Sequence, residues 1–367
     1  MRGPLPDYPW DAMAPFLARA ARHPEGALNL SIGSPVDPSP PAVRDALAAA
    51  TDAHAYPTTA GEPALREAIA AWFSRRRGVS VRPEAVLPTI GSKELVALLP
   101  MLLGLGEGEA VVFPRVAYPS YALGAALVRA EAVASDDPSE WPEHTRLVWL
   151  NSPGNPDGRV LDVDALRAAV RRARELGAVI VGDECYAEFG WSDRWRAERI
   201  PSILDPRVVG DDHRGVLAIY SLSKQSNLAG YRAAFLAGDP ALVATLLTVR
   251  KHAGLMVPGP VQAAMIAALG DDAHVDAQRE RYRRRREVLR PALEASGFRI
   301  DGSEAGLYLW ATRGEDAWRS VEWFAERGIV VGPGHFYGDA SPDHVRLALT
   351  ASDDDIAAAA RRVAQMS

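Results

Sequence analysis

The chain contains very little cysteine and very little lysine. It has one cysteine, Cys185, and three lysines, Lys93, Lys224 and Lys251, so arginine supplies nearly all of its positive charge. A single cysteine excludes an internal disulfide framework and cannot by itself build a zinc site. Because arginine stays protonated, any chemistry that requires a primary amine must fall on one of the three lysines.

The sequence also lacks a surplus of positive charge and a long apolar run. Its net charge of −6 does not favour binding to nucleic acid, which calls for a basic surface. The longest apolar run, 95–106, contains Pro100 and is too short to cross a bilayer, and the first residues include no apolar signal-like stretch. We therefore expect a cytoplasmic protein without a nucleic-acid or membrane partner, and we expect no metal.

The length of 367 residues exceeds that of one typical domain and is short for three, which predicts two domains around a shared cleft. Short buried strands alternate with helical segments between about residues 63 and 250, which predicts an α/β domain with a mostly parallel central sheet. The strands expected there are 110–113, 147–150, 178–181, 216–220 and 233–237. Further along, strands are expected at 307–311, 329–331 and 345–349 and a closing helix at 353–364. We divide the chain into a large domain, 45–252, and a smaller α+β domain, 1–44 with 253–367, that closes over the active site.

A lysine follows one of these strands in a setting that suits covalent chemistry. The segment 221–224 reads Ser-Leu-Ser-Lys, and Arg232 lies eight positions after Lys224. A lysine at a strand end can be partly desolvated, which lowers its pKa, while hydroxyls and an arginine nearby can hold an anionic group. These features suit a Schiff-base lysine. The alternative is an ordinary surface lysine in a turn.

Polar residues follow three other expected strands. Asp183 ends a buried strand and precedes Tyr186, and Asn155 lies in the Pro/Gly/Asn-rich segment 151–158. The segment 91–93, Gly-Ser-Lys, opens an apolar helix, whose free N–H groups make a natural phosphate seat. Alternatives remain open, because Asp183 could be a helix N-cap and 151–158 a turn chosen for its backbone geometry.

Together these motifs resemble those of the fold-type I pyridoxal-phosphate enzymes, in particular the class I/II aminotransferases, over nearly the whole chain. The resemblance implies pyridoxal 5′-phosphate as cofactor and a homodimer as the active unit. It implies that Lys224 is the covalent anchor and proton carrier, that Asp183 keeps the pyridine nitrogen protonated, and that Tyr186 contacts the ring's O3′. Asp157 departs from the family's pattern, which has threonine there.

The remaining site residues are also implied by the resemblance. Those for the cofactor are Gly91, Ser92, Lys93, Tyr118, Asn155, Asp183, Tyr186, Ser221, Ser223, Lys224, Arg232 and, reaching the neighbouring subunit, Tyr56. Tyr118 would stack on the ring. The residues implied for the substrate are Gly33, Asn155 and Arg346, with Arg346 gripping the α-carboxylate through two parallel hydrogen bonds.

Three segments, 5–11, 33–40 and 226–235, are most similar to the actinobacterial N-succinyldiaminopimelate aminotransferases. This resemblance implies a ping-pong exchange of an amino group between glutamate and N-succinyl-2-amino-6-oxopimelate, in diaminopimelate and lysine biosynthesis, with 2-oxoglutarate as the other oxo acid. Alternatives from the same fold are a C–S β-lyase, an aminotransferase for aspartate, methionine or aromatic amino acids including kynurenine, and a catalytically inactive sensor that binds an amino acid.

Overall fold

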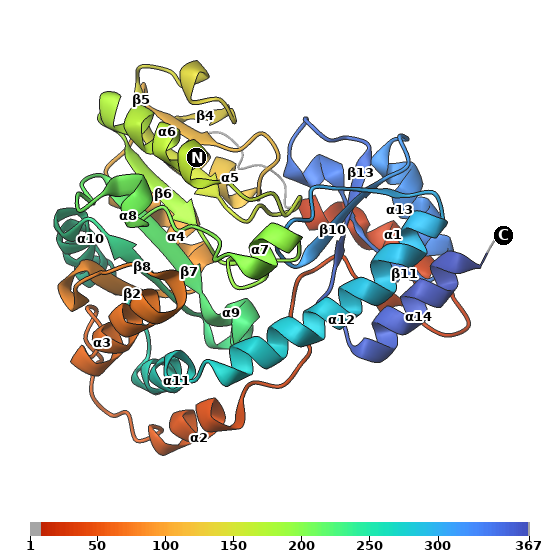
Figure 1. Cartoon of the computed structure of the whole chain (residues 1–367), viewed down its shortest axis with the longest axis horizontal. Coiled ribbons are helices and arrows are strands. Elements are labelled where there is room, and N and C mark those ends of the chain that lie inside the picture. The colour runs from red at the N-terminus through yellow and green to blue at the C-terminus, as the bar shows by residue number, and fades with distance from the viewer. Residues whose placement is uncertain (1–8, 366–367) are drawn as a thin grey trace.

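The computed structural model describes residues 9–365, and their largest sheet has seven strands in the order β2-β8-β7-β6-β5-β3-β4 (Figure 1). These strands are β2 (Val86–Ile90), β3 (Ala110–Phe113), β4 (Glu131–Ala134), β5 (Thr145–Asn151), β6 (Val179–Asp183), β7 (Val216–Ser221) and β8 (Ala233–Gly238). Only β8 runs antiparallel to its neighbours, β2 and β7. The prediction of an α/β fold with a mostly parallel sheet is therefore confirmed.

Helices cover both faces of this sheet. They are α3 (Pro63–Trp72), α4 (Ser92–Leu102), α5 (Ser120–Val128), α6 (Val163–Glu175), α10 (Pro240–Ala253) and α11 (Gly259–Leu269). One core contains apolar residues of α3, α6 and α11, and a second core contains those of α4, α5 and α10. Because both faces are covered, the inner strand β7 is buried along its whole length.

A smaller antiparallel sheet lies beside the large one (Figure 1), in the strand order β12-β13-β10-β9. Its strands are β9 (Arg299–Asp301), β10 (Tyr308–Thr312), β12 (Gly332–Pro333) and β13 (His344–Ala348). A separate parallel pair joins β1 (Leu28–Asn29) to β11 (Ile329–Val330), so the start of the chain packs with its last third. The helices around these strands are α1 (Ala14–Ala20), α12 (Ala273–Ala295), α13 (Ala317–Glu326) and α14 (Asp353–Ala364).

The predicted domain boundaries stay a prediction. Residues 1–8 of the expected small domain lie outside the described residues. Helix α11, which the division assigns to the small domain, packs against α2 (Pro41–Ala49) and α3 and contributes to a core of the large sheet. The other short helices are α7 (Asp193–Ala197), α8 (Pro206–Val209) and α9 (Leu222–Gln225).

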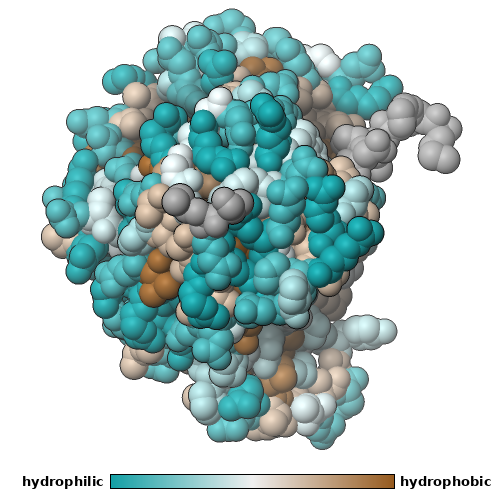
Figure 2. All heavy atoms as spheres, turned by 90° about the vertical axis from the view of Figure 1, so that its right-hand side faces the viewer, coloured by the Kyte–Doolittle hydropathy of each residue, from teal (hydrophilic) through white to brown (hydrophobic). Residues whose placement is uncertain are grey.

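Between residues 9 and 365, no helix combines the length and apolar character needed to cross a membrane. The face turned toward the viewer in Figure 2 is mostly hydrophilic, and hydrophobic residues appear on it as small separate patches.

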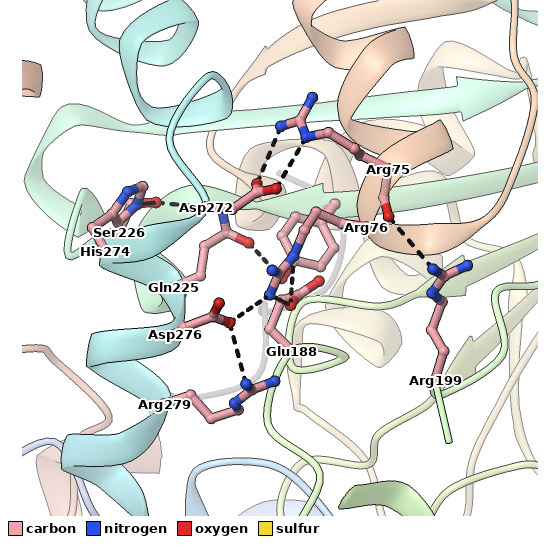
Figure 3. A network of polar contacts seen from close by, with 11 residues as sticks. Arg75, Arg76, Glu188, Arg199, Gln225, Ser226, Asp272, His274, Asp276 and Arg279 are labelled. Atoms are coloured by element: carbon pink, nitrogen blue, oxygen red, sulfur yellow. Dashed lines mark hydrogen bonds and ion pairs between the residues drawn. The ribbon is translucent and has the colours of Figure 1, made fainter. Parts of the chain in front are cut away.

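A polar network fixes the start of α12 to the large sheet's side of the molecule (Figure 3). The guanidinium of Arg76, in the π-helical turn after α3, donates to Glu188 and, at 3.1 Å, to Asp276 of α12. Arg75 Nε donates to Asp272 Oδ2 at 3.0 Å. Because Arg76 and Glu188 are largely buried, this network is weakly screened by solvent. It holds α12 to the turn that ends α3 and to the segment that follows β6.

Candidate active site

A cavity of about 1370 Å³ lies where the carboxyl ends of β5, β6 and β7 meet the small sheet. In open α/β sheets, ligands bind at this edge. Of the site residues expected from the sequence, all except Gly91 and Tyr56 line the cavity: Gly33, Ser92, Lys93, Tyr118, Asn155, Asp183, Tyr186, Ser221, Ser223, Lys224, Arg232 and Arg346. The fold therefore brings Gly33 and Arg346, which are 313 positions apart in the chain, to the wall of the same cavity.

Lys224 is placed by the abrupt change from β7 to α9. The Ser221 hydroxyl accepts the Ser223 N–H at 3.2 Å and so caps α9, which carries Lys224 into the cavity wall. The Lys224 amine donates to the Gly33 carbonyl oxygen. Burial lowers the pKa of this amine, against an opposing contribution from Tyr308. A lowered pKa leaves more of the amine unprotonated, which is the form that attacks a carbonyl carbon.

Asp183 is a buried carboxylate at the end of β6. Its Oδ2 accepts the Tyr121 hydroxyl at 2.8 Å, and its Oδ1 accepts the Cys185 N–H at 3.3 Å. Burial raises the pKa of Asp183, and these hydrogen bonds oppose the rise. No helix starts at Asp183, so the expected alternative of an N-cap does not apply. Tyr121 has no local signal in the sequence, because its link to Asp183 spans 62 positions.

Tyr186 and Tyr308 form a second buried polar pair. Their hydroxyls lie 3.3 Å apart. Burial raises the pKa of Tyr186 well above its usual value. For Tyr308, burial also acts to raise the pKa, but the positive charges of Arg346 and Lys224 outweigh it and lower the pKa overall. Either hydroxyl can donate the single hydrogen bond between them.

Tyr308 was not expected from the sequence, yet it contacts several predicted residues. The guanidinium of Arg346 lies 4.1 Å from the centre of its ring. A Cβ on Gly33 would come within 2.3 Å of its hydroxyl oxygen, so only glycine fits at position 33 without displacing Tyr308. The only sequence signal for Tyr308 is its position at the start of an expected strand.

Arg346 lies on β13 and is 3% exposed. Its Nη1 donates to Asn155 Oδ1 at 2.9 Å and its Nη2 to the Ser31 carbonyl oxygen at 2.5 Å. No carboxylate of residues 9–365 forms an ion pair with it, and its Nε is buried without a hydrogen bond. A buried charge without a counter-ion is costly, so this arginine is suited to a ligand that brings a carboxylate.

A second anion site lies at the start of α4. Gly91, with φ 75°, precedes the helix, and a Cβ there would come within 2.1 Å of Arg232 Nη2. Arg232 donates to the Ala229 carbonyl oxygen at 2.8 Å, and within the described chain it has no carboxylate partner. The Ser221 and Ser223 hydroxyls, 2.8 Å apart, line the same side of the cavity. A helix N-terminus, a guanidinium without a carboxylate partner and two hydroxyls together fit the phosphate of an organic ligand.

Asn155 is held by the loop that follows β5. Its N–H donates to Asn151 Oδ1 at 2.8 Å, and Asn151 Nδ2 donates to the carbonyl oxygens of Pro153 and Asp183, each at 3.1 Å. Asn151 therefore ties this loop to the end of β6. Besides reversing the chain, the segment 151–158 brings the Asn155 side chain into hydrogen-bond contact with Arg346.

The aromatic predictions differ in outcome. Tyr118 lines the cavity, and Lys93 Nζ lies 5.7 Å from the centre of its ring. Tyr56 is 96% exposed and lies outside the cavity lining, so its expected role toward a neighbouring subunit stays a prediction.

Comparisons with known proteins agree over nearly the whole chain. The family model for aminotransferase class I and II matches residues 25–363. The 4-dedimethylamino-4-oxo-anhydrotetracycline transaminase of Streptomyces rimosus is 58% identical over 360 residues, covering 98% of this chain and 99% of that protein. A probable aminotransferase of Mycobacterium tuberculosis is 54% identical over 361 residues, covering 98% of this chain and 85% of that protein. The crystal structure of an aminotransferase from Neisseria meningitidis superposes with a TM-score of 0.87 at 31% identity, covering 98% of this chain and 97% of that one.

Proposed function

Because the chain belongs to the class I and II aminotransferases, which depend on pyridoxal phosphate, we propose that it moves an amino group between glutamate and N-succinyl-2-amino-6-oxopimelate. The observation that supports a substrate with a carboxylate is the state of Arg346, whose guanidinium is buried and has no carboxylate partner in the described chain. Amino acids and 2-oxo acids both carry a carboxylate next to the reacting carbon. Arg346 would bind that group and so orient the Cα of the substrate.

The cavity residues fit the cofactor of this family. Arg232 and the start of α4 would hold its phosphate, because Gly91 lets the guanidinium approach the helix closely. The buried carboxylate of Asp183 would pair with the ring nitrogen and keep it protonated. The Tyr121 hydroxyl holds that carboxylate in place. When bound, pyridoxal phosphate supplies a carbon that can carry the amino group and a ring that withdraws electrons from the reacting bond.

The chain's own groups then carry out the proton movements. Lys224 would anchor the cofactor through its amine and, once displaced by the incoming amino group, would take the proton from the substrate Cα. Its lowered pKa favours the unprotonated amine that this role requires. Tyr186, which keeps its own proton because burial raises its pKa, would hydrogen-bond to the cofactor's O3′.

A second acceptor class has a specific observation in its favour. The Streptomyces rimosus relative, at 58% identity, is named for a polycyclic ketone, 4-dedimethylamino-4-oxo-anhydrotetracycline. The cavity lining includes apolar residues of α5 and β4, namely Leu123, Ala126, Ala132 and Ala134. These residues would accept an apolar acceptor more readily than a succinyl carboxylate.

We also propose a cytoplasmic homodimer. Tyr56 supports the dimer, because a large aromatic side chain that is 96% exposed in one protomer is suited to contact another. Size measurement in solution, with a Tyr56→Ala variant assayed for cofactor affinity, tests this assembly. A monomer with full cofactor affinity would contradict it.

Mixing the purified enzyme with glutamate and following the absorbance change from the pyridoxal to the pyridoxamine form tests the transferase. A panel of acceptors, N-succinyl-2-amino-6-oxopimelate, 2-oxoglutarate and the polycyclic ketone, then ranks the second substrate by kcat/KM. Release of pyruvate and ammonia from cystathionine without that absorbance change would instead establish the lyase. A preference for the polycyclic ketone would replace the proposed acceptor by the second candidate.

A further inference from the structure

The cavity contains two cationic side chains beyond the three that the proposed chemistry uses. The lysines and arginines that line it are Lys93, Arg115, Lys224, Arg232 and Arg346. Three of these have tasks in the proposed function: Lys224 anchors the cofactor, Arg232 binds its phosphate and Arg346 binds the substrate carboxylate next to Cα. Lys93 lies against the ring of Tyr118. Arg115 has no task.

The backbone of Arg115 is fixed from two sides. Its N–H donates to Asp136 Oδ1 at 3.1 Å, in the segment that follows β4. On the other side, the carbonyl oxygen of Arg115 lies so close to Gly338 that a Cβ there would come within 2.7 Å. Ala117 N–H donates to the Tyr337 carbonyl oxygen at 2.8 Å and holds the same loop to the small sheet's side. The position of Arg115 at the cavity is therefore set by the fold.

The side chain of Arg115, in contrast, is uncommitted. The residue is exposed, and its guanidinium forms no hydrogen bond or ion pair with residues 9–365. Asp339 is a carboxylate that lines the same cavity, but it does not pair with Arg115. A cation at the cavity with no protein counter-ion is available to a negatively charged part of a ligand.

We propose that Arg115 binds a second carboxylate of the substrate, distal to the carboxylate that Arg346 binds, and so selects dicarboxylic over monocarboxylic substrates. This inference rests on the proposed function. A cavity of about 1370 Å³ exceeds the roughly 300–1,000 Å³ typical of small-molecule pockets, so it has room for a substrate that extends beyond the cofactor. Glutamate carries its second carboxylate on the side chain, and a succinyl group ends in one.

The decisive comparison uses Arg115→Gln with two amino donors of similar length, glutamate and 2-aminopentanoate, which lacks the distal carboxylate. We expect Arg115→Gln to raise KM for glutamate about tenfold with little change in kcat. A tenfold change in KM is what the loss of one charged hydrogen bond at an exposed position should cause. KM for 2-aminopentanoate should stay unchanged. Arg115→Lys should retain part of the preference for glutamate, because it keeps the charge.

Arg171→Gln is the matched control. Arg171 is an exposed arginine of α6 that is not part of the cavity lining, so its replacement makes the same change in net charge without touching the site. It should leave both donors unaffected. Equal losses for both donors in Arg115→Gln, or no loss for either, would overturn the subsite.

A binding measurement separates this inference from the proposed function. Titration calorimetry with glutarate, an unreactive dicarboxylate, and with butyrate reports the subsite without turnover. Glutarate affinity should fall about tenfold in Arg115→Gln while butyrate affinity does not change. Unchanged glutarate affinity refutes the subsite even in an active transferase. If the wild-type enzyme binds glutarate but does not react with glutamate, and Arg115→Gln loses glutarate affinity, the subsite stands and glutamate is refuted as the donor.

Discussion

Replacing Arg346 should separate activity from stability, because the residue is a buried charge without a counter-ion in the described chain. A guanidinium has five N–H donors, and the protein uses two of them, on Asn155 Oδ1 and on the Ser31 carbonyl oxygen. The remaining N–H groups, including the unbonded Nε, are free for a substrate carboxylate. Arg346→Lys keeps the charge but has no planar fork, so it loses at least one charged hydrogen bond to that carboxylate.

The loss should be about 1.5–3 kcal/mol, which corresponds to a fall of about 10- to 150-fold in kcat/KM for glutamate. Arg346→Gln removes the charge and should cost more activity, but its free energy of unfolding should fall by less than about 2 kcal/mol, because removing the charge also removes its desolvation cost. Steady-state kinetics and urea unfolding of the three proteins measure both quantities. Near-normal kcat/KM in Arg346→Lys, or a stability loss of several kcal/mol in Arg346→Gln with activity retained, would refute the reasoning.

Three further predictions follow from other parts of the structure. Arg77→Met leaves the buried Glu184, 3.2 Å from its partner, without a counter-charge, and should lower the free energy of unfolding by about 3–5 kcal/mol in urea at pH 7. Burial already raises the pKa of Glu184, so Glu184 in the variant should become protonated as the pH falls. The difference in free energy of unfolding between wild type and Arg77→Met should therefore shrink toward low pH. A difference that grows from pH 8 to pH 5 would contradict Arg77 as the counter-charge of Glu184. Asp183→Asn should slow the single-turnover reaction with glutamate about 10- to 150-fold. Tyr121→Phe should slow it less, because this change removes one hydrogen bond to the Asp183 carboxylate and leaves its charge in place. Equal effects of the two variants would show that the charge of Asp183 is not what matters. Lys224→Ala should abolish the adduct that borohydride traps with the cofactor, and an adduct on another lysine, found by peptide mapping, would refute the anchor.

The parts of the site that follow strand ends were accessible to sequence reasoning. Asp183 comes directly after an apolar run and Lys224 comes three residues after the end of β7, and parallel strands bring their carboxyl ends to one edge. Local patterns of this kind also predicted the closing helix, Asp353–Ala364, to the residue. They did not predict β4, because its residues are mostly exposed at the sheet edge and form no apolar run.

What the sequence could not predict depends on contacts between distant residues. The tyrosine pair of Tyr186 and Tyr308 joins positions 122 apart, and nothing near either residue signals the other. The same holds for Arg76 and Glu188, whose charges look like parts of a solvated surface in the sequence but are largely buried in the fold. Only the packing of α3, the segment after β6 and α12 makes them partners.

Helix α12 links the large sheet's side of the molecule to the small sheet's side. Its 23 residues form a rod about 34 Å long, at 1.5 Å per residue. The polar network of Figure 3 pins its first turns at Asp272 and Asp276, while its body packs along α14 beside the small sheet. Because Arg285 in the middle of α12 also donates to Asp37 and Asp353, the helix is held along its length and ties the turn after α3 to the small sheet's side of the molecule.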